Sequence, residues 1–136
     1  MMNISGTYKR TQEENWDAYL AKLGVNFVVR KALTASPPIL EITEVSPGKW
    51  KMKTSTTVKS FEDNFEIGKE FEETAFDGRA CKTIFTAEGE QILVQSQVAK
   101  KSTEKSIKII REFSDKGVAV QYICEDVVST QFFERQ

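Results

Sequence analysis

Residues 39–56 read ILEITEVSPGKWKMKTST, and this stretch decides the fold. Apolar and polar side chains alternate in residues 39–45 and again in residues 50–56, and Ser46-Pro47-Gly48 lies between them. Successive side chains of a β-strand point to opposite faces, and Ser, Pro and Gly are typical of tight turns. The stretch therefore predicts two antiparallel strands joined by a short turn.

The same pattern of alternating segments and turn residues continues to the end of the chain. Seven more segments have strand character: residues 61–66, 70–76, 79–86, 91–98, 106–113, 118–124 and 129–133. Glycine, aspartate or short polar runs separate them, and residues 6–10 form an opening strand. Short strands with tight turns favour an antiparallel meander. We see no boundary for a second domain and expect one domain over residues 1–136.

A helical hairpin is predicted between the first two strands. Four apolar residues recur at helical spacing: Trp16, Tyr19, Leu20 and Leu23. Asn15 suits the N-cap of this helix, and Gly24 suits the position after its end. Asn26 suits the cap of a second helix over residues 27–33, which ends before the Ser-Pro-Pro of residues 36–38.

Several polar residues lie among apolar neighbours on the predicted strands: Thr54, Thr56, Ser96, Arg111 and Gln131. The core of a β-sandwich would be drier than this. A barrel around a partly wet cavity tolerates such an interior, because buried polar groups can bond to ordered water or to a ligand. We therefore expect an all-β fold, a small closed barrel.

The composition argues against several classes of function. The chain has 136 residues, 40% of them hydrophobic and 29% charged, which is ordinary for a globular domain. A net charge of −1 provides no general field for nucleic acid, so we expect no nucleic-acid partner. The chain has no histidine, the commonest general base and metal ligand. No nucleophile–base pair or metal cluster can be assembled, so we predict no enzyme activity, cofactor or metal.

The expected compartment is the cytoplasm. The first seven residues show neither a charged segment nor an apolar run, so we expect no secretory signal and no transmembrane segment. Cys81 and Cys124 lie far apart without metal-ligand spacing. Two buried free thiols in a reducing compartment are favoured over a disulfide.

Short strings along the whole chain match one known family. They are Gly6-Thr7-Tyr8-Lys9, Asn15-Trp16-Asp17-Ala18-Tyr19, Leu23-Gly24-Val25, Lys53-Thr54-Ser55-Thr56-Thr57, Phe65-Glu66-Ile67-Gly68, Glu70-Phe71-Glu72-Glu73-Thr74, Asp77-Gly78-Arg79 and Ile110-Arg111-Glu112-Phe113. In this order and spacing the chain resembles the intracellular lipid-binding proteins, which include the fatty-acid-binding and cellular retinoid-binding proteins. The resemblance implies a ten-stranded antiparallel closed barrel capped by a two-helix lid, with a ligand portal beside the second helix.

The resemblance also points to a head-group site. Many fatty-acid-binding members hold the carboxylate with an Arg on a late strand and an Arg-x-Tyr on the last strand. Arg111 matches the first residue, but Gln131 and Phe133 stand where the second Arg and the Tyr are expected. Retinol-binding members carry a similar Gln-x-Phe but usually lack the Arg. The site is therefore mixed, since Gln131 can donate to a carboxylate or accept from a hydroxyl.

Further candidates surround these three residues. Tyr122 either supplies the hydroxyl that Phe133 lacks or is a core aromatic. The remaining ligand-contacting candidates are Trp16, Tyr19, Phe27, Asp77, Ile109 and Val120, of which Trp16 also suits packing and Asp77 also suits a turn-stabilising pair with Arg79. Portal candidates are Phe27, Val28, Leu33, Val58 and Phe76, and a basic group on the helices comprises Lys22, Arg30 and Lys31.

The sequence thus predicts a monomer that binds and transports a long-chain fatty acid in an internal cavity. The alternatives are a retinoid or other neutral hydrophobic ligand, or an interaction protein regulated by lipid. The basic group on the helices either steers the lid toward anionic membranes in transient contacts or is a solvated face.

Overall fold

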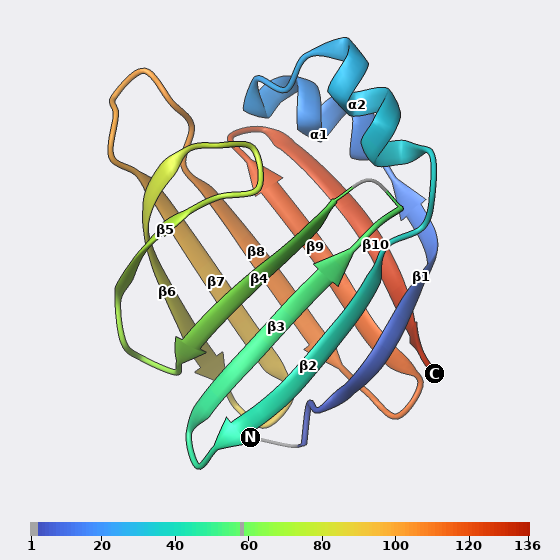
Figure 1. Cartoon of the computed structure of the whole chain (residues 1–136), viewed down its shortest axis with the longest axis vertical. Coiled ribbons are helices and arrows are strands. Elements are labelled where there is room, and N and C mark those ends of the chain that lie inside the picture. Colours follow the sequence, from blue (N-terminus) through green and yellow to red (C-terminus); the bar gives the residue numbers. More distant parts are fainter. Residues whose placement is uncertain (1–2, 58) are drawn as a thin grey trace.

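A computed structural model describes residues 3–57 and 59–136, so the portal candidate Val58 lies outside the described residues. The helices are α1 (Trp16–Leu23) and α2 (Phe27–Thr34). The strands are β1 (Gly6–Glu14), β2 (Ile39–Ser46), β3 (Lys49–Ser55), β4 (Ser60–Glu66), β5 (Phe71–Thr74), β6 (Ala80–Glu88), β7 (Ile92–Ala99), β8 (Ile107–Phe113), β9 (Gly117–Cys124) and β10 (Val127–Arg135). The strands form one antiparallel sheet that curls into a barrel, which confirms the predicted fold (Figure 1).

The strand order explains how the barrel closes. It runs β4-β3-β2-β1-β10-β9-β8-β7-β6-β5, so β1 and β10 pair and bring the two ends of the meander together. β4 and β5 are the two ends of this order, and no ladder joins them among the described pairs. Side chains cover this β4–β5 seam instead, because Phe65 of β4 stacks on Phe85 of β6 with ring centroids 3.8 Å apart. Phe71 of β5 stacks on the same ring.

Alternation along the strands separates the interior from the surface. In β8, Ile109, Arg111 and Phe113 are buried, whereas Lys108 and Glu112 are exposed. This period of two is the pattern from which the strands were predicted. One polar residue is not where we expected it: the inward-facing polar residues of β7 are Gln95 and Gln97, and Ser96 between them has the opposite parity and does not line the cavity.

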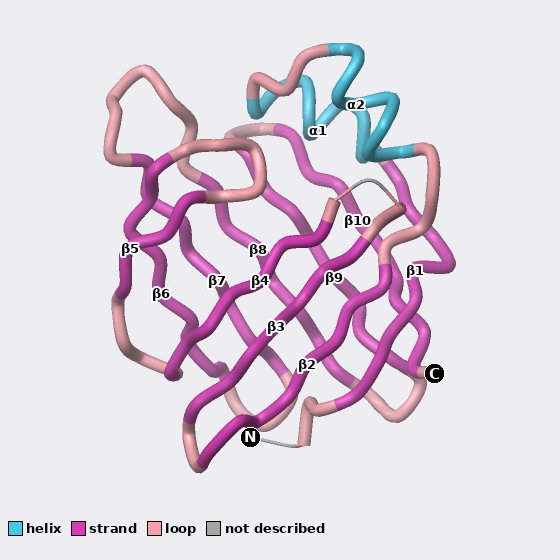
Figure 2. Tube along the Cα trace, in the orientation of Figure 1, coloured by secondary structure: helices cyan, strands magenta, loops and turns pink. Residues whose placement is uncertain are grey.

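The two helices cover one end of the barrel, and the β5–β6 and β7–β8 loops lie at the same end (Figure 2). The Asn26 side chain caps α2 by accepting a 3.0 Å hydrogen bond from the backbone N–H of Val29. Gly24 ends α1 with φ 104°, which suits a residue without Cβ. Asn15 stands at the N-cap position of α1 as predicted, but with φ 64° its side chain does not cap the helix and donates to the carbonyl of Val128.

β1 and β5 end at other residues than predicted, because backbone hydrogen bonding determines where a strand ends. β1 continues beyond residue 10 to Glu14, because it pairs with β10 as far as Thr130. β5 ends at Thr74 because the backbone turns there, with the N–H of Ala75 bonded to the carbonyl of Arg79.

Both cysteines are buried free thiols, as predicted. Among the described residues, neither helix is long and apolar enough to cross a bilayer.

Candidate ligand-binding cavity

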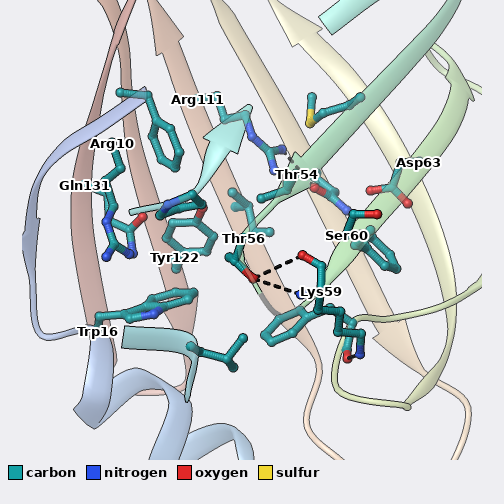
Figure 3. A pocket seen from close by; sticks show the side chains of 18 of the residues that line it. Arg10, Trp16, Thr54, Thr56, Lys59, Ser60, Asp63, Arg111, Tyr122 and Gln131 are labelled. Atoms are coloured by element: carbon teal, nitrogen blue, oxygen red, sulfur yellow. Dashed lines mark hydrogen bonds between the residues drawn. The ribbon is translucent and has the colours of Figure 1, made fainter. Parts of the chain in front are cut away.

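A cavity lies inside the barrel beneath the helices. The space between the protein atoms is about 880 Å³, a figure that includes the open mouth of the cavity. Its apolar wall includes Trp16, Met52, Ile107, Ile109, Tyr122 and Phe133. Its buried polar wall includes Arg10, Asp63, Gln95, Gln97, Arg111 and Gln131. The cavity therefore combines an apolar lining with buried charged side chains (Figure 3).

Arg111 is the charged group predicted from the sequence, and it points into this cavity (Figure 3). Only 7% of its surface is exposed. Its Nη1 donates a 2.8 Å hydrogen bond to Oε1 of Gln95, a neutral acceptor. Burial lowers the pKa of the guanidinium, although arginine stays protonated in proteins. Among the described residues no carboxylate forms a salt bridge with it.

A pair of acidic side chains lies beside this cation. Asp63 of β4 is buried, and its pKa is raised well above the usual range by burial and by its hydrogen bond with Glu73 of β5. Glu73 Oε1 accepts from Thr83 Oγ1 at 2.5 Å and from Gln97 Nε2 at 2.7 Å. Two neighbouring carboxylates repel each other, so a proton on Asp63 provides the donor that the pair needs.

The network continues toward the mouth of the barrel. Arg79 donates to Gln97 Oε1 at 3.0 Å and forms a buried 2.7 Å salt bridge with Asp77. It also donates to the carbonyl of Lys105 in the β7–β8 loop. A chain of polar contacts thus runs from the mouth through Gln97 and Glu73 to the interior. At the mouth a groove separates the helices from residues 77–79 and 103–105.

Three buried donors in the cavity wall lack a hydrogen-bond partner among the described residues. They are Nη1 of Arg10, Nε1 of Trp16 and Nε2 of Gln131. All three side chains line the cavity. Buried polar groups without partners are rare in folded proteins, and each one requires an explanation such as a water molecule or a ligand.

This architecture and lining match a known family. The model of the lipocalin / cytosolic fatty-acid binding protein family matches residues 5–136. The chain belongs to this family. That match spans every strand and both helices, so it rests on the whole barrel and not on one motif.

Individual family members cover the full chain. A fatty acid-binding protein of Tyrophagus putrescentiae is 39% identical over 136 residues, 100% of both chains. Cellular retinoic acid-binding protein 2 of Rattus norvegicus is 37% identical over 139 residues, again 100% of both. Among solved structures, the Schistosoma mansoni fatty acid binding protein in complex with arachidonic acid superposes with a TM-score of 0.91 at 29% identity, covering 100% of this chain and 98% of that one.

Six of the residues proposed from the sequence line the cavity together: Trp16, Ile109, Arg111, Tyr122, Gln131 and Phe133. Tyr19 does not, because it is fully buried behind Trp16, on which its ring stacks with centroids 5.4 Å apart. Val120 packs in the core. Phe27 lies outside on α2 with 61% of its surface exposed. Asp77 lines the groove at the mouth, where its salt bridge with Arg79 fits the turn-stabilising role.

Sequence reasoning missed Arg10, Asp63 and the two glutamines of β7. Arg10 shares the parity of buried Tyr8 on β1, and Asp63 shares that of Phe65 on β4. Extending the period-two alternation along β1 and β4 to these two residues predicts that both side chains face the interior of the barrel. The portal candidates Leu33 and Phe76 both line the cavity and the groove at its mouth.

Proposed function

We propose that the protein binds a long-chain fatty acid in its barrel and carries it through the cytoplasm, without catalysing a reaction. The observation that carries this proposal is Arg111, a buried guanidinium that faces a largely apolar cavity and whose hydrogen-bond partner among the described residues is a neutral amide. A buried charge that forms no salt bridge is costly, so a carboxylate ligand would stabilise it. Guanidinium offers parallel donors that match both carboxylate oxygens. The family relatives named for fatty acids support the same ligand class.

The helical lid fits the exchange of such a ligand. Leu33 of α2 borders the mouth, whereas Phe27 and Val28 project outward with 61% and 75% of their surfaces exposed. The charged groups of Arg30 and Lys31 lie 5.7 and 5.3 Å from the Phe27 ring centroid. Exposed apolar side chains beside basic ones suit transient contact with anionic membranes by a monomeric carrier.

A retinoid is the second candidate, and a specific observation favours it. Gln131 and Phe133 both line the cavity, where many fatty-acid-binding members carry Arg and Tyr. Several relatives over the full chain are named cellular retinoic acid-binding proteins, with 35–37% identity. Retinoic acid also ends in a carboxylate, so Arg111 suits either acid. A neutral retinoid would leave that charge without a partner.

Two measurements test the proposed function. Native mass spectrometry of the protein purified without denaturation should find a monomer with a bound lipid acid, and extraction should identify the lipid. Titration with oleate, retinoic acid, oleyl alcohol and retinol then distinguishes the effect of the ligand's hydrocarbon shape on affinity from the effect of its head group. We expect both acids to bind more tightly than their alcohols, with oleate at least as tight as retinoic acid. Equal affinity for acids and alcohols would contradict the carboxylate assignment.

A further inference from the structure

Arg10 is a second arginine inside the barrel. Only 9% of its surface is exposed, and its side chain lines the same cavity as Arg111 (Figure 3). On β1 it follows the inward parity of Tyr8, while Lys9 between them is exposed. The ladder between β1 and β10 shifts register just after Arg10, between Arg10 and Gln12. Such a bulge changes the direction of neighbouring side chains, and bulges are common next to functional sites.

The position of Arg10 relative to β10 is informative. Its register partner is Phe133, so Gln131 is its diagonal neighbour on the inward face of the adjacent strand. Diagonal neighbours in a sheet have Cα atoms roughly 7–8 Å apart, within reach of long side chains. Figure 3 shows the Arg10 and Gln131 side chains at the same end of the cavity. A guanidinium on residue 10 can therefore occupy the space that a charged side chain on residue 131 would otherwise use.

The positive charge of Arg10 has fewer acidic neighbours than the positive charge of Arg111. Two acids, the buried Asp63 and the half-buried Glu73, act on the charge of Arg111. Within the described chain, the carboxylate that acts on the Arg10 charge is Glu13, an exposed residue whose Oε2 accepts from the backbone N–H of Trp16. Burial lowers the pKa of Arg10, and its Nη1 has no partner among the described residues. Arg79 is neutralised by Asp77, so among the described residues two buried arginines, Arg10 and Arg111, line the cavity against the shared negative charge of the Asp63–Glu73 pair. One carboxylate would neutralise this excess.

We propose that Arg10 is the second cation of the head-group site, and that its guanidinium and the Gln131 amide together bind the carboxylate of a monoanionic lipid. Both supply buried donors that lack partners within the described chain, Nη1 and Nε2. The Tyr122 hydroxyl lies within electrostatic reach of both Arg10 and Arg111, so the two cations serve one region of the cavity. The proposal rests on the proposed function, because it assigns a further residue to the same cavity.

The test compares oleate with oleyl alcohol in Arg10→Leu, a change that suits a buried position facing an apolar wall. Hydrogen bonds to charged groups are strong enough that oleate affinity should fall about tenfold or more. Affinity for the alcohol should stay within about twofold or rise, since its hydroxyl needs no counter-charge. Without ligand, Arg10→Leu should unfold at the same or higher temperature, because an uncompensated buried cation is removed.

Two further variants separate the explanations. Arg10→Leu combined with Gln131→Arg moves the charge to the diagonal position and should restore oleate affinity. Lys9→Gln removes a charge from the outer face of the same strand and should leave both affinities unchanged. If Arg10→Leu does not fold, Arg10→Gln keeps a polar side chain there and should lose oleate affinity in the same way.

The outcomes are distinct. Equal loss for acid and alcohol, or unchanged oleate affinity in Arg10→Leu, would overturn the role of Arg10. In that case wild type still prefers oleate to the alcohol, so the proposed function stands. If wild type shows no such preference, the proposed function itself fails.

Discussion

Asp63 and Glu73 share a hydrogen bond across the β4–β5 seam, where no backbone ladder joins the two strands among the described pairs. A carboxyl pair can do this only while one member is protonated, because two carboxylates accept but do not donate. Burial and the hydrogen bond with Glu73 raise the pKa of Asp63, which favours its protonated form. The seam is therefore a place where the stability of the barrel depends on pH.

We predict that Asp63→Asn stabilises the barrel increasingly as pH rises. The folded pKa of Asp63 is above its unfolded value of about 3.9. The wild type therefore loses stability as pH rises from about 4 through the raised pKa. Asparagine does not titrate, and its N–H can donate to Glu73 at every pH. The unfolding free energy in urea should exceed that of wild type by about 1 kcal/mol or more at pH 8, and by less at pH 5.

The control for this comparison is Glu62→Gln, a change in an exposed carboxylate on the same strand. Its difference from wild type should stay within about 0.5 kcal/mol at both pH values. If the advantage of Asp63→Asn is the same at pH 5 and pH 8, the shared proton does not exist.

Phe27→Ala is expected to change ligand exchange more than stability. Phe27 is largely exposed and is not part of the buried core, so the unfolding free energy should change by about 1 kcal/mol at most, including its contacts with two cations. Transfer of a fluorescent fatty acid to anionic vesicles should slow, because the lid loses an apolar contact with the membrane. Stopped-flow fluorescence measures the transfer rate.

Val45→Ala provides the matched control, since Val45 is 57% exposed on β2 in the opposite half of the strand from the helices. It should leave the transfer rate unchanged. A rate that falls equally in both variants, or a large loss of stability in Phe27→Ala, would place the portal elsewhere.

The sequence predicts the barrel well because period-two alternation and turn residues act locally. It predicts that Arg111 faces the interior because the neighbours of Arg111 on one face, Ile109 and Phe113, are apolar. It does not predict which residues meet across the cavity, since that depends on the register between strands distant along the chain. Arg10 and Gln131 are 121 positions apart, and only the β1–β10 pairing makes them diagonal neighbours.

Arg111→Gln is predicted to weaken binding of acids selectively. The change removes the charge but keeps a donor beside Gln95. Oleate affinity should fall by about 10- to 100-fold, whereas affinity for oleyl alcohol should change by less than about threefold. Isothermal titration of both ligands measures the difference. Equal loss for acid and alcohol would mean that Arg111 serves the architecture of the barrel, and a neutral lipid would then be the better candidate ligand.

Gln131→Arg is predicted to strengthen fatty-acid binding while destabilising the empty barrel. The new guanidinium would lie diagonally from Arg10, and two buried cations repel each other when no anion lies between them. The ligand-free variant should therefore unfold at a lower temperature than wild type. Oleate neutralises both charges, so its affinity should rise by about tenfold, and the increase in melting temperature on adding oleate should exceed that of wild type. Oleyl alcohol cannot neutralise either cation and should bind no better than before. An equal increase in affinity for alcohol and acid would show that residue 131 acts through the shape of the cavity. Other residues of the barrel would then recognise the charge of the head group.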